Sequence, residues 1–406
     1  MAVGAHTGYQ LSWVALLVAP LLAVVLTIAA QVGAVARGDL QTLTVKRFGR
    51  RVGAILVVTV VIVNVVTIAA DLQAGAAGVG LLAGVDARLL VVPLGLVLVG
   101  LLLVGKYDEV VAVLRYALLG FLTFGAAAIL ARPDWSGLLK ASLVPSLSLR
   151  RDAVVGALAL LGTTLTSYVY VWETVSRGSE HSRGSEHSRV SEHGRGSEHG
   201  RGSEQSHDES PNDAPLSGAR IGAVAGALFT AAILWFMLVA SAATLGRHHE
   251  TVGSAQDAAR ALAPLAGSLT TDLFAVGLVT SAVVALPVLM ATTAYVVGAQ
   301  FDWRRGLSEP VGRARGFYGA LAASVALGLA VSLAKISVIG VLVAASVIGG
   351  LGTPFSLILL VLLARDRTVM HAKPISTRLA IAGWFVVIVT GGSGLLFLTA
   401  AALGKL

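Results

Sequence analysis

The sequence predicts an all-α membrane protein with about ten transmembrane helices. Of its 406 residues, 56% are hydrophobic and 13% are charged, and the mean hydropathy of +0.82 exceeds that of a soluble domain of this length. Ten apolar runs approach or exceed the ~20 residues that cross a bilayer. The chain has no cysteine, so disulfides and thiolate metal sites are excluded, and a metal would need oxygen or nitrogen ligands.

The expected spans follow from these runs, and the basic residues between them predict the orientation. The spans cover residues 10–36, 52–83, 88–105, 108–131, 152–175, 218–246, 269–300, 316–335, 338–364 and 378–403. Alternate loops are basic, with Arg37, Lys46, Arg47, Arg50 and Arg51 in the first of them. The positive-inside rule places these loops in the cytoplasm and both termini outside. The net charge of +8 therefore indicates topology, and no soluble basic domain is present to bind nucleic acid.

Three regions are expected: a first membrane half over 1–175, a disordered cytoplasmic loop over 176–216, and a second membrane half over 217–406. The loop repeats a Ser/Gly-Arg-Gly/Val-Ser-Glu-His/Gln unit that cannot bury a core. Its regularly spaced histidines leave two interpretations open, a repeat expansion without a specific role or weak metal capture.

The second expected span contains a polar face. Asn64, Thr67 and Asp71 follow one another at i, i+3 and i+7, so they share one side of a helix. An ionisable group inside a bilayer costs about 2.5–3.5 kcal/mol on insertion scales, which favours an ion pathway or proton relay. The alternative is an aspartate that hydroxyl groups cap near a helix end.

The fifth span contains a cluster of hydroxyl groups after Gly162, namely Thr163, Thr164, Ser167 and Tyr168. A helix interrupted at this depth exposes backbone groups that bind ions. The alternative is that the hydroxyls bond to the preceding turn and only bend the helix.

Further helix breaks or gating points are expected at Pro287, which leaves a carbonyl unpaired, and at Gly349 and Gly350. Close packing between helices would explain the two glycines equally well.

Several segments, in the correct order, resemble the Nramp superfamily of divalent metal transporters and its bacterial magnesium and manganese branch. The segment from Asn64 to Leu72 is similar to the family's third-helix pattern N-x-x-N-I-x-A-D-L, and Gly162–Tyr168 resembles the sixth-helix signature G-T-T-I-S-P-Y. Gly8–Leu40, Leu262–Gly267, 286–295 and Leu363–Met370 also match. The resemblance implies a leucine-transporter-like fold of two inverted five-helix repeats, with metal bound where helices one and six unwind. Thr163, Thr164, Ser167 and Tyr168 occupy the matching positions of helix six.

The sequence also departs from the family pattern. The first helix, with its Asp-Pro motif, is expected to be absent, since Met1 falls near the junction leading into the second helix. Ser167 replaces the signature proline of helix six, and Gly349-Gly350 stands where the branch usually has Asn-Gly.

Together these features predict a multi-pass cell-membrane protein that carries a divalent cation, of magnesium or manganese type, by alternating access, with protons as a possible coupling ion. The cation is substrate, and no cofactor is expected. Two alternatives stay open, a non-transporting sensor or scaffold and a same-fold transporter of an organic substrate. An enzyme is not expected, because no nucleophile, base and orienting group can be assembled inside the membrane.

Overall fold

The computed structural model describes residues 2–104, 118–146, 151–178, 214–244, 268–334, 338–371 and 373–403. Within these ranges all regular secondary structure is helical, which confirms the expected all-α class. Residues 179–213, which contain the histidine repeats, lie outside the described part of the chain.

The described helices run in this order: α1 Ala2–Thr7, α2 Ser12–Ala36, α3 Leu40–Phe48, α4 Arg50–Ala83, α5 Ala87–Val104, α7 Leu122–Leu130, α8 Trp135–Leu143, α9 Arg151–Thr164, a helix over 167–178, α11 Ala214–Thr244, α13 Ser268–Gln300, α14 Arg315–Leu333, α15 Val338–Arg365, α16 Arg367–Met370 and α17 Thr377–Ala402.

Eight described helical segments are long and apolar enough to cross a membrane. They are α2, α4, α9 with the helix that follows it, α11, α13, α14, α15 and α17. Two shorter apolar helical segments are Ala87–Leu103, in α5, and Leu118–Leu130, which contains α7. Each of the ten expected spans therefore contains an apolar helix, although the fourth lies partly in residues 105–117, outside the described part.

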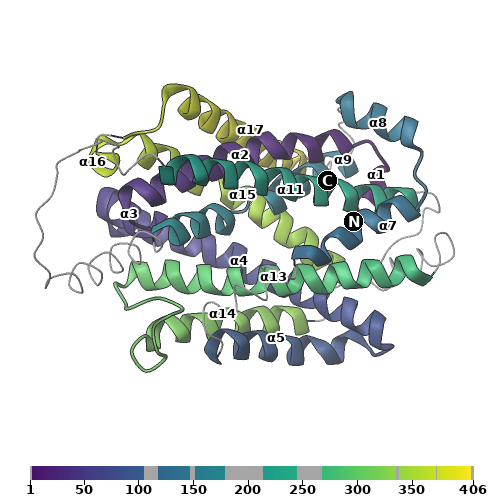
Figure 1. Cartoon of the computed structure of the whole chain (residues 1–406), viewed down its shortest axis with the longest axis horizontal. Coiled ribbons are helices and arrows are strands. Elements are labelled where there is room, and N and C mark those ends of the chain that lie inside the picture. The colour runs from purple at the N-terminus through teal and green to yellow at the C-terminus, as the bar shows by residue number, and fades with distance from the viewer. Residues whose placement is uncertain are drawn as a thin grey trace, which may run out of the picture.

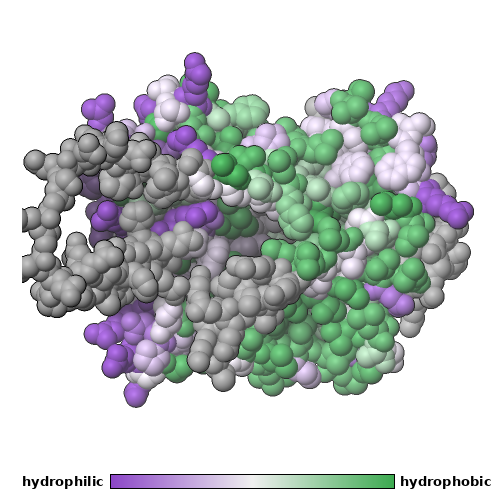
Figure 2. All heavy atoms as spheres, in the orientation of Figure 1, coloured by the Kyte–Doolittle hydropathy of each residue, from purple (hydrophilic) through white to green (hydrophobic). Residues whose placement is uncertain are grey.

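The long helices lie side by side along the longest axis of the molecule (Figure 1). Two hydrophobic clusters hold them together. The larger joins α2, the helix over 167–178, α15 and α17, and the other joins α4, α5, α13 and α14. Figure 2 shows a broad hydrophobic surface along the bundle, with hydrophilic residues concentrated at its ends. The bundle therefore presents a wide apolar surface to lipid.

Polar contacts fasten the end of the bundle that carries α3. Asp39 caps α3 by accepting hydrogen bonds from the amide and hydroxyl of Thr42 at 2.8 and 2.7 Å, and Arg305 lies 3.2 Å from the same carboxylate. The amide of Leu40 donates to the buried Thr174 hydroxyl at 3.0 Å. These bonds join α3 to the loop before α14 and to the helix over 167–178.

Glycines allow close approach of helix backbones. A Cβ atom on Gly78 of α4 would lie 2.7 Å from the carbonyl oxygen of Ala275 of α13. One on Gly33 of α2 would lie 2.8 Å from the carbonyl oxygen of Thr174. Small residues at such contacts let membrane helices gain van der Waals packing.

We predict that Gly78→Val lowers thermal stability in detergent, since the new side chain must push α4 and α13 apart. Overpacking costs about 1–3 kcal/mol. Gly226→Val on α11 is the matched control, because nothing lies within 4 Å of a Cβ atom there. Equal melting temperatures for the two variants would contradict the proposed close contact.

Candidate functional site

The long segment formed by α9 and its successor is interrupted in the middle. The helix ends at Thr164 and resumes at residue 167, so Leu165 and Thr166 are not helical, and both are buried. The amide of Leu165 still donates to the carbonyl of Leu161 at 2.9 Å. The next three carbonyls, those of residues 162–164, lie in the last turn of α9, where a helix end leaves carbonyls without an intrahelical partner. The interruption lies three residues after Gly162 and among the predicted hydroxyls.

Gly162 packs directly against the glycine pair of α15. A Cβ atom on Gly349 would lie 3.1 Å from the carbonyl oxygen of Gly162 and 3.4 Å from Cγ2 of Thr166. A Cβ atom on Gly350 would lie 2.8 Å from Cδ1 of Leu158. The structure thus brings the three predicted glycines together. Because α15 is continuous at Gly349 and Gly350, the helix does not break there, and the alternative of a close helix contact describes the two glycines. A gating role for them stays a prediction.

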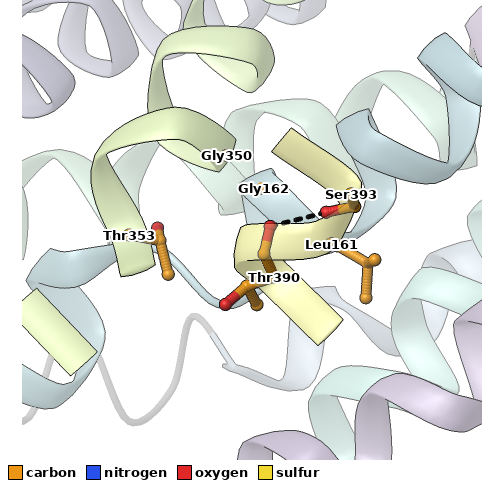
Figure 3. Close-up of a pocket in the computed structure, with 6 residues that line it drawn as sticks. All are labelled: Leu161, Gly162, Gly350, Thr353, Thr390 and Ser393. Atoms are coloured by element: carbon orange, nitrogen blue, oxygen red, sulfur yellow. Dashed lines mark hydrogen bonds between the residues drawn. The ribbon is translucent and has the colours of Figure 1, made fainter. Parts of the chain in front are cut away.

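A narrow pocket lies beside this contact (Figure 3). It is lined by Leu161, Gly162, Gly350, Thr353, Thr390 and Ser393 and leaves no room for a water molecule. Thr353 donates to the carbonyl of Gly349 at 2.7 Å, and Ser393 donates to that of Thr390 at 2.8 Å. The hydroxyls of α15 and α17 are not among the residues predicted from the sequence. Thr390 and Ser393 lie three residues apart in an apolar span, and this spacing could have identified them in the sequence.

The predicted hydroxyls on the two sides of the interruption differ in their bonding. Thr163 is exposed and donates to the carbonyl of Ala159 at 2.7 Å, and the buried Thr164 donates to that of Leu160 at 2.8 Å. These bonds match the interpretation in which hydroxyls bond to the preceding turn. Ser167 is fully buried and its Oγ has no hydrogen-bond partner. Since a buried polar group without a partner costs about 1–3 kcal/mol, Ser167 is the hydroxyl of this set best suited to a ligand.

Asn64 of α4 faces α13, where a hydrogen bond to Thr293 fixes the orientation of the Asn64 side-chain amide. The Thr293 hydroxyl donates to the carbonyl of Leu289 at 2.8 Å, so it can only accept from Asn64. Asn64 Nδ2 donates to it at 2.9 Å. The carbonyl oxygen, Oδ1, therefore points away from this bond, and it is buried without a partner. It is an oxygen free to accept a hydrogen bond or to bind a cation.

The other two predicted members of this face lie apart from that bond. Thr67 donates to the carbonyl of Val63 in its own helix at 2.7 Å. Asp71 is half-buried and lies close enough to Tyr168 for electrostatic interaction. Tyr168 itself packs against the cluster of α4, α5, α13 and α14. Tyr168, two residues after the interruption, thus lies between this cluster and the region of the Asp71 carboxylate on α4.

Pro287 lies within α13, which is continuous from Ser268 to Gln300. The helix therefore does not break at Pro287, and a gating role for this residue stays a prediction. Proline removes only the one hydrogen bond to the carbonyl four residues earlier. The helix continues past Pro287 because buried side chains of α13 pack on both sides of the proline.

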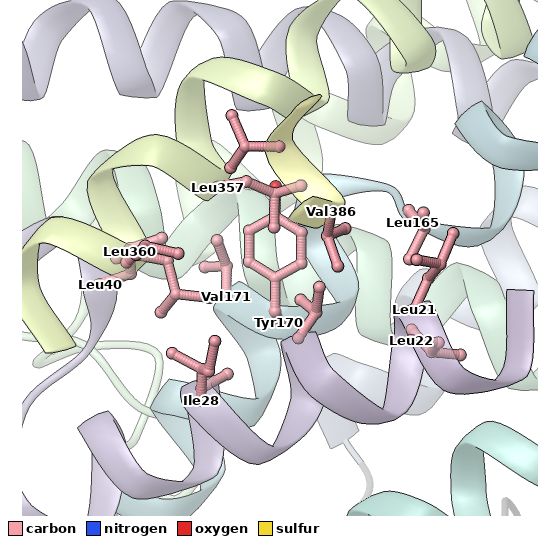
Figure 4. Packing of buried hydrophobic residues seen from close by; sticks show 14 of the residues in the cluster. Leu21, Leu22, Ile28, Leu40, Leu165, Tyr170, Val171, Leu357, Leu360 and Val386 are labelled. Carbon is pink, nitrogen blue, oxygen red and sulfur yellow. The ribbon is translucent and has the colours of Figure 1, made fainter. Parts of the chain in front are cut away.

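Tyr170 fixes the helix after the interruption to α15. It is fully buried among leucine, isoleucine and valine side chains that include those of α2, α15 and α17 (Figure 4). Its hydroxyl donates to the carbonyl of Thr353 at 3.3 Å and makes a short contact with Ser356 Oγ.

An aromatic chain fixes the same helix on another side. Trp172 packs edge-to-face on Tyr295 of α13 with 6.2 Å between ring centroids. Tyr295 packs in the same manner on Phe317 of α14 at 5.0 Å.

Oxygen atoms dominate the polar groups of this region. In the part of the chain that is described, no group of three or more His, Asp or Glu side chains is arranged to hold a metal ion. A cation at the interruption would meet hydroxyl and backbone oxygens, a set suited to hard cations.

Comparison with known proteins identifies the family. The model of the family described as natural resistance-associated macrophage protein-like, Nramp, matches residues 1–400. This chain belongs to the Nramp family. Nramp proteins are multi-pass membrane transporters of divalent metal cations and not enzymes, so these expectations from the sequence are confirmed. No curated protein sequence matches.

Solved structures agree on the fold. A manganese transporter of Eremococcus coleocola, in complex with an aromatic bis-isothiourea compound, superposes with a TM-score of 0.69 at 19% identity, covering 97% of this chain and 81% of that one. A mutant form of the same transporter gives 0.67 at 19% identity, covering 98% and 82%. Mhp1, a nucleobase–cation symporter, gives 0.50 at 15% identity, covering 99% and 88%. The Nramp chain therefore has the leucine-transporter-like fold.

We predict that Tyr170 and Ser356 of this Nramp protein are energetically coupled. Tyr170→Phe removes a buried hydroxyl and is expected to cost about 0.5–1.5 kcal/mol of stability. A double-mutant cycle with Ser356→Ala, read by denaturant unfolding in mixed micelles, isolates the pair. Strict additivity of the two substitutions would show that the hydroxyls do not interact.

Proposed function

We propose that this Nramp protein transports Mn²⁺ or Mg²⁺ by alternating access and binds the cation at the interruption over residues 165–166. The observations that carry the proposal are two buried oxygens without a hydrogen-bond partner, Ser167 Oγ at the interruption and Asn64 Oδ1 on α4. Both are expected to gain a partner when a cation binds. The carbonyls at the end of α9 supply further hard oxygen ligands.

The choice of cation rests on ligand chemistry. The chain has no cysteine, and the residues at the interruption carry neither thioether nor imidazole. Oxygen ligands suit magnesium and manganese better than softer metals. The manganese transporters of similar fold are consistent with manganese.

Asp71 is the proposed site of proton coupling. It is the carboxylate of the polar face on α4, and it lies within electrostatic range of Tyr168 at the interruption. A cation that arrives there favours the ionised carboxylate, so cation binding would release a proton from Asp71. Release of that proton to the side that the cation enters would move cation and proton in the same direction. The same residues would then serve both the cation and the proton.

We predict that Ser167→Ala weakens cation uptake into proteoliposomes, raising the half-saturating Mn²⁺ concentration about tenfold, equivalent to about 1.4 kcal/mol. Ser324→Ala is the matched control, because that buried hydroxyl already donates to the carbonyl of Leu321 at 2.7 Å. Unchanged Mn²⁺ and Mg²⁺ uptake by Ser167→Ala would place the cation elsewhere. Absence of uptake by a folded wild type would favour the non-transporting interpretation.

We also predict that Asp71→Asn separates cation movement from proton movement. With an internal pH dye, wild type should acidify vesicles as Mn²⁺ enters, and Asp71→Asn should lose this signal. Asp86→Asn is the control, since Asp86 is exposed and caps the start of α5. Cation-driven acidification that persists in Asp71→Asn would remove Asp71 from the proton pathway.

A further inference from the structure

Exposed basic residues gather at the end of the bundle that carries α3 and α16. We call them the basic patch. It consists of Lys46, Arg47, Arg50, Arg51, Arg365, Arg367 and Arg378, all of them exposed. Figure 2 shows strongly hydrophilic side chains at this end.

Contacts join the three parts of the basic patch. Arg47 at the end of α3 forms a salt bridge with Asp366, which lies between Arg365 and Arg367. Arg365 Nη1 lies 3.4 Å from the Thr377 hydroxyl, next to Arg378 at the start of α17. Residues distant in the sequence thus form one surface.

The basic patch carries a large uncompensated charge. Asp366 is the carboxylate set among its members, and hydrogen bonds from Thr368 and Arg47 lower the pKa of Asp366 to about 2. The aspartate is therefore ionised at neutral pH and offsets one of the seven cations. Like charges this close repel one another, and Arg50 and Arg51 also stand in the first turn of α4, where the helix dipole disfavours cations. An anion bound here would relieve both costs.

The position of these cations next to exposed apolar side chains indicates what kind of anion binds. On α4, Arg51 is followed on the same face by Ile55, Val58 and Ile62, which are 55%, 56% and 48% exposed. On α17, Arg378 is followed by Ile381, Phe385 and Ile388, which are 65%, 55% and 68% exposed.

The same arrangement occurs on α15, where Arg365 comes one turn after Leu362, which is 40% exposed. The contact between Arg365 and Thr377 places this end of α15 beside the start of α17. In a membrane protein, such apolar stripes contact acyl chains, so the cations at their ends lie at the level of the headgroups.

We propose that the basic patch binds the phosphate headgroups of anionic phospholipids, with the acyl chains lying on the apolar stripes of α4, α15 and α17. A soluble phosphate would meet the cations alone, whereas a lipid meets the cations and the stripes together. Nucleic acid could not use the stripes. This inference is independent of which cation the protein carries.

The test is lipid binding to the purified full chain in neutral detergent, by native mass spectrometry and thermal stability. Phosphatidylglycerol should bind and raise the melting temperature more than phosphatidylcholine with the same acyl chains. The triple variant R51Q/R365Q/R378Q should bind phosphatidylglycerol on the order of 100-fold more weakly, since each basic residue contributes about 1 kcal/mol, or about fivefold. Its phosphatidylcholine binding should not change.

Two control variants separate the charge from the fold. R51K/R365K/R378K keeps the charge and should keep the preference for phosphatidylglycerol. R88Q should keep it as well, because Arg88 is also exposed and precedes the exposed Val92 and Leu96 on α5, yet it is not part of the basic patch.

Three results would overturn the proposal. The first is equal binding of the two lipids by wild type, and the second is an unchanged preference in the glutamine variant. The third is full displacement of the lipid by millimolar inorganic phosphate, which would indicate a site for soluble anions.

Discussion

A bilayer offers no water to backbone N–H and C=O groups, so each must find a partner in the protein, and the break over residues 165–166 is where this requirement is hardest to meet. The surrounding structure is arranged around it. Gly349 and Gly350 let the backbone of α15 approach Gly162 closely, and Tyr170 fixes the resumed helix to α15. The interruption persists because α15 beside it is a continuous helix that contacts both Gly162 and Tyr170.

Hydrophobic runs and polar residues within them were sufficient to predict the class of fold and the location of the interruption. Bilayer thickness sets the length of a span, so the ten apolar runs could be located directly in the sequence. The family pattern pointed to the segment after Gly162. Both signals are local in sequence, which is why they could be read without a structure.

Partners across helices could not be read in this way. Periodicity shows that Asn64 shares a face with Asp71, but it does not show that Asn64 bonds to Thr293 while Asp71 lies within electrostatic range of Tyr168. Proline and glycine also have two outcomes in a membrane helix. At Pro287 the helix continues because the side chains packed around it stabilise the helix despite one missing hydrogen bond. At Gly349 the absence of a side chain allows close contact with Gly162, and the helix does not break. Only tertiary packing decides between these outcomes.

The aromatic chain has a mechanical consequence. Trp172 reaches α13 and α14 through Tyr295 and Phe317, while Tyr170, two residues earlier, is bonded to α15. The half of the interrupted segment after residue 166 is thus braced from two directions by large side chains. The half before it meets α15 at Gly349 and Gly350, which contact the backbone of Gly162 and the aliphatic side chain of Leu158. Stiffness is therefore unequal across the interruption, and a rearrangement there would displace α9 more readily than the helix that follows it.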